Sequence, residues 1–251
     1  MTKYTLNGRR YWLVGASEGL GAALAEAMSQ RGARLVLSSR RADALEAVAR
    51  PLGAEVVPMD VADPASVAAA AAQVGEVDGL VWLAAVYWPM RAQDWDTEKV
   101  VAMCDINLTG CARVLGAVLP RMMARNEGHV VLTGSLSGFR GLPGAVGYGA
   151  SKAGVMSLAE TLRADLAHTG VRIQLANPGF IRTRLTAMND FAMPQLMEPA
   201  QAADQIIRLM ESGRFSRSFP TPFQWLLRGS AFLPEWLYYK LVAAKDKKPS
   251  T

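Results

Sequence analysis

The fold is decided by Gly15-Ala16-Ser17-Glu18-Gly19-Leu20-Gly21, which joins an apolar run to an amphipathic helical pattern. Glycines have no Cβ, so an anionic group can approach the backbone, and the helix that follows offers unpaired N–H groups and the positive end of its dipole. A strand, a glycine turn and a helix in this order predict a phosphate-binding loop, although glycines also make ordinary tight turns. The candidate contacts in this loop are Gly15, Ser17, Glu18, Gly19, Leu20 and Gly21.

Outward from this loop, short apolar runs alternate with amphipathic patterns. The predicted strands are residues 11–14, 34–38, 55–57, 79–84, 129–133 and 171–176, and the predicted helices are residues 20–30, 42–50, 64–74, 114–125 and 151–167. Strands joined by crossover helices require a mostly parallel sheet with ligands at the carboxyl ends of its strands. The fold class is therefore α/β: a single doubly wound domain over residues 1–251, with about seven strands and helices on both faces.

The composition fits one domain and argues against several other classes of protein. The chain has 251 residues, 51% of them hydrophobic, and no linker or repeat divides it.

The net charge of +5 comes from scattered residues, and the dense group Lys245, Lys247 and Lys248 is typical of a solvated tail, so we expect no nucleic-acid partner. No signal peptide, apolar run of roughly 20 residues or metal motif is evident. We expect a cytoplasmic protein in which Cys104 and Cys111 are packing residues, too far apart for a disulfide.

The second predicted strand ends in Ser38-Ser39-Arg40-Arg41. A dinucleotide with a free ribose 2′-hydroxyl favours Asp or Glu at this place, and the chain has neither. Because a guanidinium binds phosphate through a planar fork of donors, Ser39 and Arg40 favour NADP(H) over NAD(H). A solvated arginine pair at a helix start is the alternative. Asp60, after the third strand, is a candidate for contacting an adenine amino group or for capping a helix.

The strongest chemical signal is Tyr148-Gly-Ala-Ser-Lys152, whose four-residue spacing places a phenol and an ammonium on one helix face. A nearby cation favours phenolate, so we expect Lys152 to lower the pKa of Tyr148 and make it an acid–base group. Ser135, after the fifth strand, can donate to a substrate oxygen; the alternative is an ordinary turn serine, and Ser137 is a nearby decoy. Asn107 is an amide in an apolar helical pattern, which indicates a specific role such as holding a water.

With these motifs in this order, the chain resembles the short-chain dehydrogenase/reductase family of Rossmann-fold, NAD(P)(H)-dependent oxidoreductases. The resemblance covers residues 11–183 and rests on the glycine loop, Asp60-Val61, Asn107, Ser135, Tyr148 with Lys152, and Asn177-Pro178-Gly179 with Thr183. It implies that Ser135 orients the substrate oxygen, Tyr148 transfers a proton, Lys152 binds the nicotinamide ribose and lowers the tyrosine pKa, and Asn107 holds a relay water. The further cofactor contacts that we expect are Val61, Ala84, Ala85, Tyr148, Lys152, Pro178, Gly179, Ile181 and Thr183.

Two positions depart from the family pattern. The family usually has Asn-Asn-Ala-Gly after the fourth strand, where this chain has Trp82-Leu83-Ala84-Ala85. We expect this change to remove an amide that braces the sheet and to add bulk near the ribose. Val14 stands where the family often has Thr, which removes one hydrogen bond from the loop. Neither departure touches the candidate catalytic residues.

Residues 184–251 are expected to hold a substrate lid and an apolar C-terminal extension. Soft apolar side chains there indicate a flexible lid over a hydrophobic alcohol or carbonyl substrate, with core packing as the alternative. They belong to Phe191, Met193, Leu196 and Met197. Residues 222–243 carry more large apolar side chains than a soluble monomer leaves in water. We favour a cap or a contact in a homo-oligomer over peripheral membrane contact, because Arg228 and Glu235 interrupt the apolar face.

Together these patterns predict an NADP(H)-dependent oxidoreductase that interconverts an alcohol and a carbonyl. The alternative is a non-catalytic dinucleotide-sensing protein. Such a protein has no need of Tyr148 and Lys152, and the chain keeps both.

Overall fold

The computed structural model describes residues 4–189, 191 and 193–244 and contains a seven-stranded sheet in which every pairing is parallel. The strand order is β3-β2-β1-β4-β5-β6-β7. The strands are β1 (Arg10–Val14), β2 (Arg34–Ser38), β3 (Glu55–Val56), β4 (Gly79–Trp82), β5 (Gly128–Thr133), β6 (Val171–Pro178) and β7 (Ser216–Phe219). All six predicted strands are confirmed, and β7 lies at the edge of the sheet. The tail lysines Lys245, Lys247 and Lys248 lie outside the described residues.

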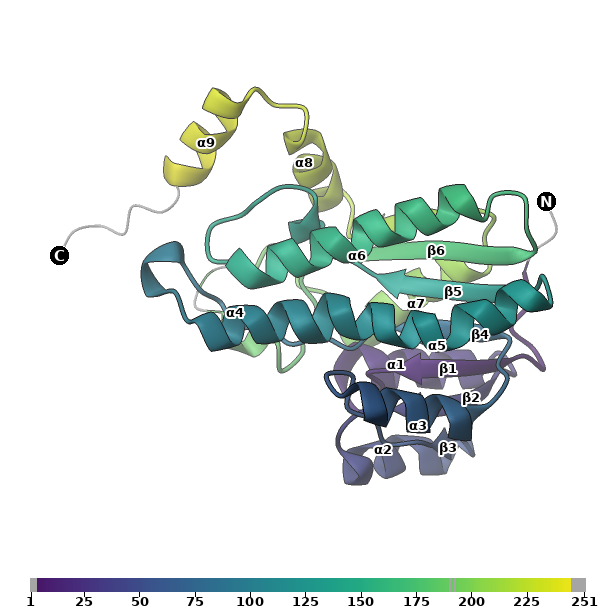
Figure 1. The fold of residues 1–251 in the computed structure, drawn as a ribbon. Helices are drawn as coiled ribbons and strands as arrows, with labels where there is room; N and C mark the ends of the chain where they lie inside the picture. Colours follow the sequence, from purple (N-terminus) through teal and green to yellow (C-terminus); the bar gives the residue numbers. More distant parts are fainter. Residues whose placement is uncertain (1–3, 190, 192, 245–251) are drawn as a thin grey trace.

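Helices cover both faces of the sheet, as Figure 1 shows. The helices of the domain are α1 (Gly19–Ser29), α2 (Ala42–Ala49), α3 (Pro64–Val74), α4 (Thr97–Cys104), α5 (Gly110–Ala124), α6 (Val146–Asp165) and α7 (Pro199–Met210). One apolar cluster packs α3, α5 and α6 on one face, and a second packs α1, α2 and α7 on the other. The doubly wound α/β fold is thus confirmed. α4 and α7 are not among the predicted helices.

Local sequence signals explain where several helices begin. The Asp63 carboxylate accepts a hydrogen bond from the Ala65 N–H at 2.9 Å, and Pro64 occupies the first helical position of α3. α7 begins with Pro199 and with a capping box between Glu198 and Gln201. Both arrangements satisfy N–H groups that have no partner inside the helix.

The strand order reverses between β1 and β4. The chain runs outward from β1 to β2 and β3 and then returns to place β4 on the other side of β1. Ligands of doubly wound sheets bind beside the carboxyl ends of the strands at such a reversal. The glycine loop follows β1 and the Ala84-Ala85 segment follows β4, so the topology brings both to this edge.

One helical run has the length and composition of a membrane span, contrary to expectation. Thr97–Ala124 contains an 18-residue window with a mean hydropathy of 1.3. Within this run, α4 packs on α6 and α5 packs on α3, and a third of the apolar window is buried by the domain. Of the two cysteines in this run, Cys111 is buried and Cys104 half-buried, and both are free thiols, as expected.

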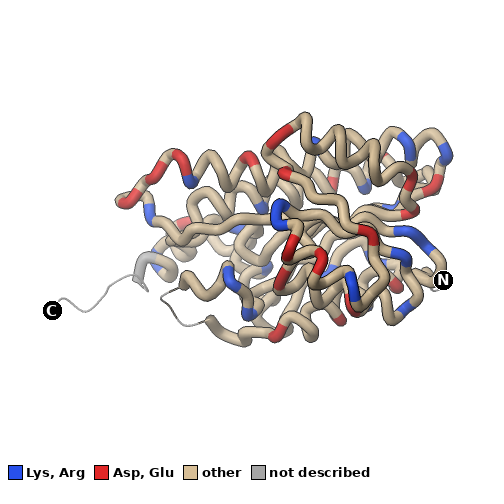
Figure 2. The backbone as a smooth tube through the Cα atoms, turned by 90° about the horizontal axis from the view of Figure 1, so that it is seen from below, with Lys and Arg blue, Asp and Glu red and all other residues tan. Residues whose placement is uncertain are grey.

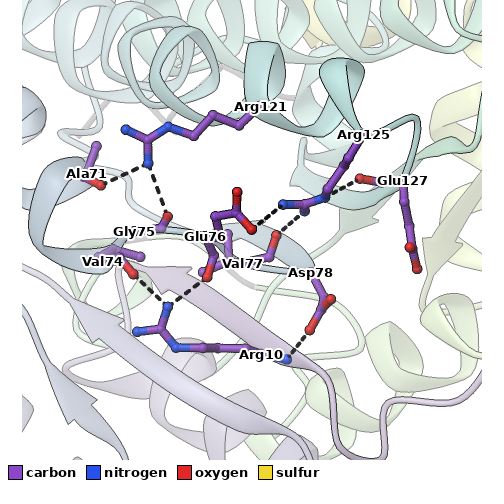
Figure 3. Close-up of polar contacts among 10 residues, drawn as sticks. All are labelled: Arg10, Ala71, Val74, Gly75, Glu76, Val77, Asp78, Arg121, Arg125 and Glu127. Atoms are coloured by element: carbon purple, nitrogen blue, oxygen red, sulfur yellow. Dashed lines mark hydrogen bonds and ion pairs between the residues drawn. The ribbon is translucent and has the colours of Figure 1, made fainter.

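The opposite edge of the sheet, where the strands begin, is held by arginines (Figure 3). The Arg10 guanidinium donates to the Val74 and Glu76 carbonyls at 2.6 and 2.8 Å, and the Arg10 N–H donates to the Asp78 carboxylate at 2.7 Å. Arg121 and Arg125 of the α5 region bind further carbonyls of the same segment. These hydrogen bonds hold the segment between α3 and β4 in place, so the arginines have a structural role.

The C-terminal segment forms two helices, α8 (Phe223–Ser230) and α9 (Glu235–Ala244), which project from the body of the domain (Figure 1). We call these two helices and their connection the C-terminal hairpin. Over the rest of the chain, basic and acidic residues are interspersed in the view of Figure 2, which matches the scattered charge of the sequence.

Candidate active site

The glycine loop is a compact turn whose backbone leaves no room for side chains. A Cβ on Gly15, where φ is 96°, would lie 2.5 Å from the Ala84 nitrogen, and a Cβ on Gly21 would lie 2.1 Å from the Gly15 carbonyl oxygen. The turn therefore packs directly against the segment that follows β4. Glycine at both positions keeps this turn in place where α1 begins.

The segment after β6 closes over the same loop. A Cβ on Gly19 would lie 2.9 Å from the Thr183 methyl group, and the Gly179 N–H donates to the Phe219 carbonyl at 2.7 Å. Ile181, buried between these positions, forms a bridge to Met197. The structure thus brings the predicted contacts Pro178, Gly179, Ile181 and Thr183 to the carboxyl edge of the sheet, with Thr183 against the glycine loop.

Near the glycine loop, Arg41 and Arg184 are paired with Glu18, whereas Arg40 has no carboxylate partner among the described residues. Glu18 is paired with Arg41 at 2.7 Å and with Arg184 at 3.0 Å, so its negative charge is balanced by two cations. Arg40 is exposed, and within the described part of the chain its guanidinium has no ion-pair or hydrogen-bond partner. The neighbouring Ser39 hydroxyl oxygen is buried and unbonded. A free guanidinium beside an unsatisfied hydroxyl fits an anionic group.

Asp60 and Val61 follow β3, and each makes a contact that stabilises the surrounding fold. The Asp60 carboxylate accepts the Ala62 N–H at 3.0 Å, and Val61 packs against Gly110 of α5. The helix cap in this region is Asp63 and not Asp60. Asp60 therefore shapes its own turn, and its other carboxylate oxygen has no hydrogen-bond partner among the described residues.

Ser135, Tyr148 and Lys152 come together beside the carboxyl ends of β5 and β4. Ser135 follows β5, while Tyr148 and Lys152 lie in the first two turns of α6. The Ser135 hydroxyl lies close enough to the Tyr148 phenol to lower its pKa. The Lys152 ammonium nitrogen lies 5.7 Å from the centroid of the tyrosine ring and donates to the Thr133 carbonyl at 2.9 Å. The three side chains that the sequence singled out are thus neighbours in space.

Burial shifts the pKa values of this pair in opposite directions. Burial raises the pKa of Tyr148 to about 12, the nearby Ser135 hydroxyl partly opposes this shift, and the nearby Tyr87 adds to it. Burial lowers the pKa of Lys152 from 10.5 to about 8. The expected lowering of the tyrosine pKa by lysine is therefore wrong for the chain alone, because desolvation of the phenolate outweighs the distant cation.

Asn107 makes three side-chain hydrogen bonds to protein groups. Its side-chain oxygen accepts the Val86 N–H at 2.7 Å, and its side-chain nitrogen donates to the Val86 carbonyl and to the Ser151 hydroxyl, each at 3.0 Å. The residue sits in a five-residue π-helical turn, Asp105–Thr109, between α4 and α5. Asn107 thus ties the segment after β4 to α6 through both of its side-chain N–H donors. Its side-chain oxygen keeps a second acceptor position, and the relay water stays a prediction.

Two residues of this site are not among the sequence predictions. The Tyr87 ring packs edge-on against the Tyr148 ring at 4.9 Å, and its hydroxyl donates to Asn189 at 3.0 Å. Ser137, which the sequence offered only as a decoy for Ser135, donates its hydroxyl to Ser135 at 2.9 Å and so leaves the Ser135 proton available to another acceptor. The aromatic pair Tyr87-Trp88 after β4 is visible in the sequence. Its position against α6, however, follows only from the fold.

The bulk expected from Trp82 is not at this edge. Trp82 is completely buried in the cluster that packs α3, α5 and α6, and Leu83 packs on the opposite cluster. The expectation of extra bulk beside the ribose is therefore wrong for Trp82 and stays a prediction for the partly buried Leu83. The Leu83 N–H donates to the Val14 carbonyl at 2.8 Å, which braces the segment after β4 against β1.

Comparison with known proteins agrees with this arrangement. The family model for short chain dehydrogenase matches residues 11–192. An uncharacterized oxidoreductase of Myxococcus xanthus is 38% identical over 235 residues, which cover 90% of this chain and 93% of the relative. A solved short chain dehydrogenase/reductase family protein is 30% identical with a TM-score of 0.79, covering 86% of this chain and 96% of its own. A solved putative betaketoacyl-ACP reductase is 31% identical with a TM-score of 0.76, covering 85% and 96%. The chain therefore belongs to the short-chain dehydrogenase/reductase family of nicotinamide-dependent oxidoreductases.

Proposed function

We propose that the protein transfers a hydride between NADP(H) and an alcohol or carbonyl carbon of an apolar substrate, with Tyr148 exchanging the proton. The observation that carries this proposal is the grouping of Ser135, Tyr148 and Lys152 at one edge of the sheet, where the Ser135 hydroxyl lowers the pKa of Tyr148 and the Lys152 ammonium lies 5.7 Å from the tyrosine ring. Two adjacent hydroxyls can both contact one substrate oxygen, and the ammonium stabilises a phenolate when the proton leaves.

The residues beside β1 and β2 fit NADP(H). The glycine turn, the N-terminus of α1, the unbonded Ser39 hydroxyl and the free Arg40 guanidinium would hold its phosphates. Lys152, Thr183 and the loops after β4 and β6 would hold the nicotinamide half. When bound, the nicotinamide supplies or accepts the hydride.

The proton states of the chain favour reduction of a carbonyl near neutral pH. A pKa of about 12 keeps Tyr148 protonated, so the phenol is ready to donate to a carbonyl oxygen as the carbon receives a hydride. Lys152, with a pKa of about 8, is mostly a cation at pH 7 and can stabilise the phenolate that remains. The Ser137 hydroxyl orients Ser135 toward the same oxygen.

Aromatic side chains support an apolar substrate. Phe180, directly after β6, packs against Phe191 at 5.8 Å and stacks on Phe223 of α8 at 5.9 Å. Phe191 itself remains half exposed, as a side chain of a mobile cover would be. The lid function of residues 184–197 stays part of this proposal.

The experiment that tests the reaction compares Tyr148→Phe with Tyr87→Phe in NADPH oxidation assays over a panel of apolar ketones and aldehydes. Loss of a general acid lowers turnover by about 10² to 10⁴-fold, so Tyr148→Phe should be nearly inactive while its affinity for NADPH stays within about twofold. Tyr87→Phe loses a hydroxyl that is bound to Asn189 and should keep most of its activity. Equal turnover of wild type and Tyr148→Phe would refute the assignment. NADPH binding without turnover of any substrate by the wild type would favour the dinucleotide-sensing alternative.

We further propose a cytoplasmic homo-oligomer that forms through the outer faces of α5 and α6. An apolar depression of about 340 Å³ is lined there by Leu115, Leu119, Met123, Leu158 and Leu162 among others. Apolar surface of this kind is typical of contacts between identical subunits. The two free cysteines suit a reducing compartment. Light scattering of the purified protein and of Leu119→Asp tests the contact, since a monomeric wild type would rule it out.

A further inference from the structure

The C-terminal hairpin presents large apolar side chains to solvent. Six of them are between 52% and 87% exposed, far more than a soluble surface usually leaves in one short segment. They are Trp225, Leu226, Phe232, Trp236, Tyr239 and Leu241. Basic residues Arg228 and Lys240 are exposed among them, and Glu235 is the one acidic residue between Phe223 and Val242.

The hairpin is fixed to the domain by a specific set of contacts. The Arg140 guanidinium donates to the Ser230 carbonyl and, at 3.0 Å, to the Leu233 carbonyl, and it lies 3.8 Å over the Tyr238 ring. The Tyr238 hydroxyl donates to the Gly141 carbonyl. Arg140 therefore holds both helices in a defined position, with Tyr238 turned inward and the six apolar side chains turned outward.

A basic cavity adjoins this apolar surface. It has a volume of about 540 Å³ and lies between β7, the middle of α7 and α8. Its lining includes Arg214, Arg217 and Arg228 together with Trp225, and it includes no Asp or Glu. Within the described ranges none of the three guanidinium groups is paired with a carboxylate; Arg217 donates only to the Gln205 amide, at 2.8 Å.

The cations around this cavity crowd one another. The pKa of Arg217 lies below its usual value because it is partly buried and because the cations Arg208 and Arg214 disfavour a further positive charge. An anion in the cavity would remove this repulsion and would use donors that have no carboxylate partner.

We propose that the C-terminal hairpin and the adjoining cavity form a docking surface for a membrane that contains anionic phospholipid. Trp225, Trp236 and their apolar neighbours enter the boundary between headgroups and acyl chains, where tryptophan and tyrosine are favoured. The arginines of the cavity bind a lipid phosphate. This inference concerns location and is independent of the reaction proposed above.

Charge favours a lipid surface over a second copy of the chain. A two-fold contact through this face would bury the arginine cavities of both subunits in one interface, where like charges repel. A lipid phosphate supplies the opposite charge, and the apolar rim matches the layer just below it. In the sequence, Arg228 interrupts the apolar face and argues against membrane contact. In the structure, Arg228 lines the cavity, where its guanidinium can bind a lipid phosphate.

Docking would place the candidate active site beside the lipid. Arg140, which anchors the hairpin, follows shortly after Ser135, and α8 contacts the short turn Leu136–Gly138 between them. Phe223, at the start of α8, stacks on Phe180 beside β6. An apolar substrate dissolved in the membrane would thus have a short route to Tyr148.

The test is vesicle cosedimentation of the full-length protein. With about 30 mol% phosphatidylglycerol in phosphatidylcholine we expect at least a tenfold higher partition coefficient than with phosphatidylcholine alone, and a loss of this gain in high salt. Trp225→Gln/Trp236→Gln should abolish binding to both kinds of vesicle, while Trp95→Gln, an exposed tryptophan outside the hairpin, should not change it. Arg217→Gln/Arg228→Gln should remove only the preference for anionic lipid, and Arg50→Gln is its control.

A second measurement needs no variant. Brominated acyl chains quench tryptophans only when these insert, so quenching of the wild type on anionic vesicles is expected. Failure of the wild type to pellet or to be quenched would overturn the proposal. So would saturable binding of inorganic phosphate that depends on Arg217 without any binding to vesicles, which would make the cavity a site for soluble anions. Conversion of an oligomer to a monomer by Trp225→Gln/Trp236→Gln, without lipid binding by the wild type, would assign the surface to a second copy.

Discussion

Replacing Lys152 with Met should stabilise the fold while destroying the proposed activity. Lys152 is 2% exposed, and burial lowers its pKa from 10.5 to about 8. At pH 7 the lysine is charged, and burying this charge lowers the free energy of unfolding by about 3 kcal/mol. Methionine has a similar length and no charge, so the variant escapes this cost. It also leaves the Thr133 carbonyl without the lysine donor, which costs about 1–2 kcal/mol.

The net expectation is a gain of about 1–2 kcal/mol at pH 7, or a rise in Tm of roughly 2–8 °C for a chain of this size. The gain should depend on pH with a definite sign. Between pH 8 and 10.5 the unfolded chain keeps the lysine proton and the folded chain does not, so wild-type stability rises with pH across this window. The advantage of Lys152→Met should therefore shrink as pH rises and should be gone near pH 10.

Equilibrium urea unfolding of both proteins without cofactor, at pH 7 and pH 9.5, measures these differences. Lys240→Met, which changes an exposed lysine, controls for the general effect of removing a charge. A variant that is less stable than wild type at pH 7, by an amount that does not change with pH, would show that the buried ammonium stabilises the fold. Retained turnover of Lys152→Met would separately contradict its proposed role beside Tyr148.

Two further predictions concern the cofactor and the core. Calorimetric dissociation constants should favour NADPH over NADH by at least about tenfold, or about 1.4 kcal/mol, and Arg40→Ala should erase most of this difference while Arg50→Ala keeps it. Equal affinities in the wild type would mean that Arg40 contacts no phosphate. His129, buried between the Tyr11 hydroxyl and the Gln174 side chain, has its pKa lowered by burial from 6.5 to about 3. The unfolded chain alone binds this proton below pH 6.5, so stability should fall with acidity, by about 2 kcal/mol at pH 5. An acid dependence of urea unfolding that is the same in His129→Asn would remove His129 as its cause.

Much of the fold could be predicted because local sequence and global structure agree. Five of the six predicted strands are apolar and lie inside the sheet, and the sixth, β3, is a short edge strand. The helix after the glycine loop begins where the loop predicts. β7 could not be predicted, since Ser216-Arg217-Ser218-Phe219 has one large apolar side chain. An edge strand paired on one side needs little hydrophobic pattern, and its parallel pairing with β6 depends on a distant part of the chain.

Candidate site residues could be predicted where a motif fixes their spacing. Tyr148 and Lys152 are one helical turn apart, so their proximity follows from the helix alone. The contacts of Asn107 could not be predicted, because they require the π-helical turn and the approach of Val86 and Ser151 from two other segments. Tyr87 was missed for the same reason, since its contact with Tyr148 joins residues far apart in the sequence.

The acid–base properties of the pair were the hardest to predict, because they depend on burial and not on spacing. From sequence, a lysine four residues from a tyrosine indicates a stabilised phenolate. In the structure both groups are withdrawn from water, and desolvation disfavours each charged form, raising the pKa of Tyr148 and lowering that of Lys152. The chain by itself therefore favours a neutral phenol beside a lysine that loses its proton readily. Such a pair is prepared to donate a proton to a carbonyl oxygen, and in the reverse direction the phenol must first lose its proton against the cost of burial.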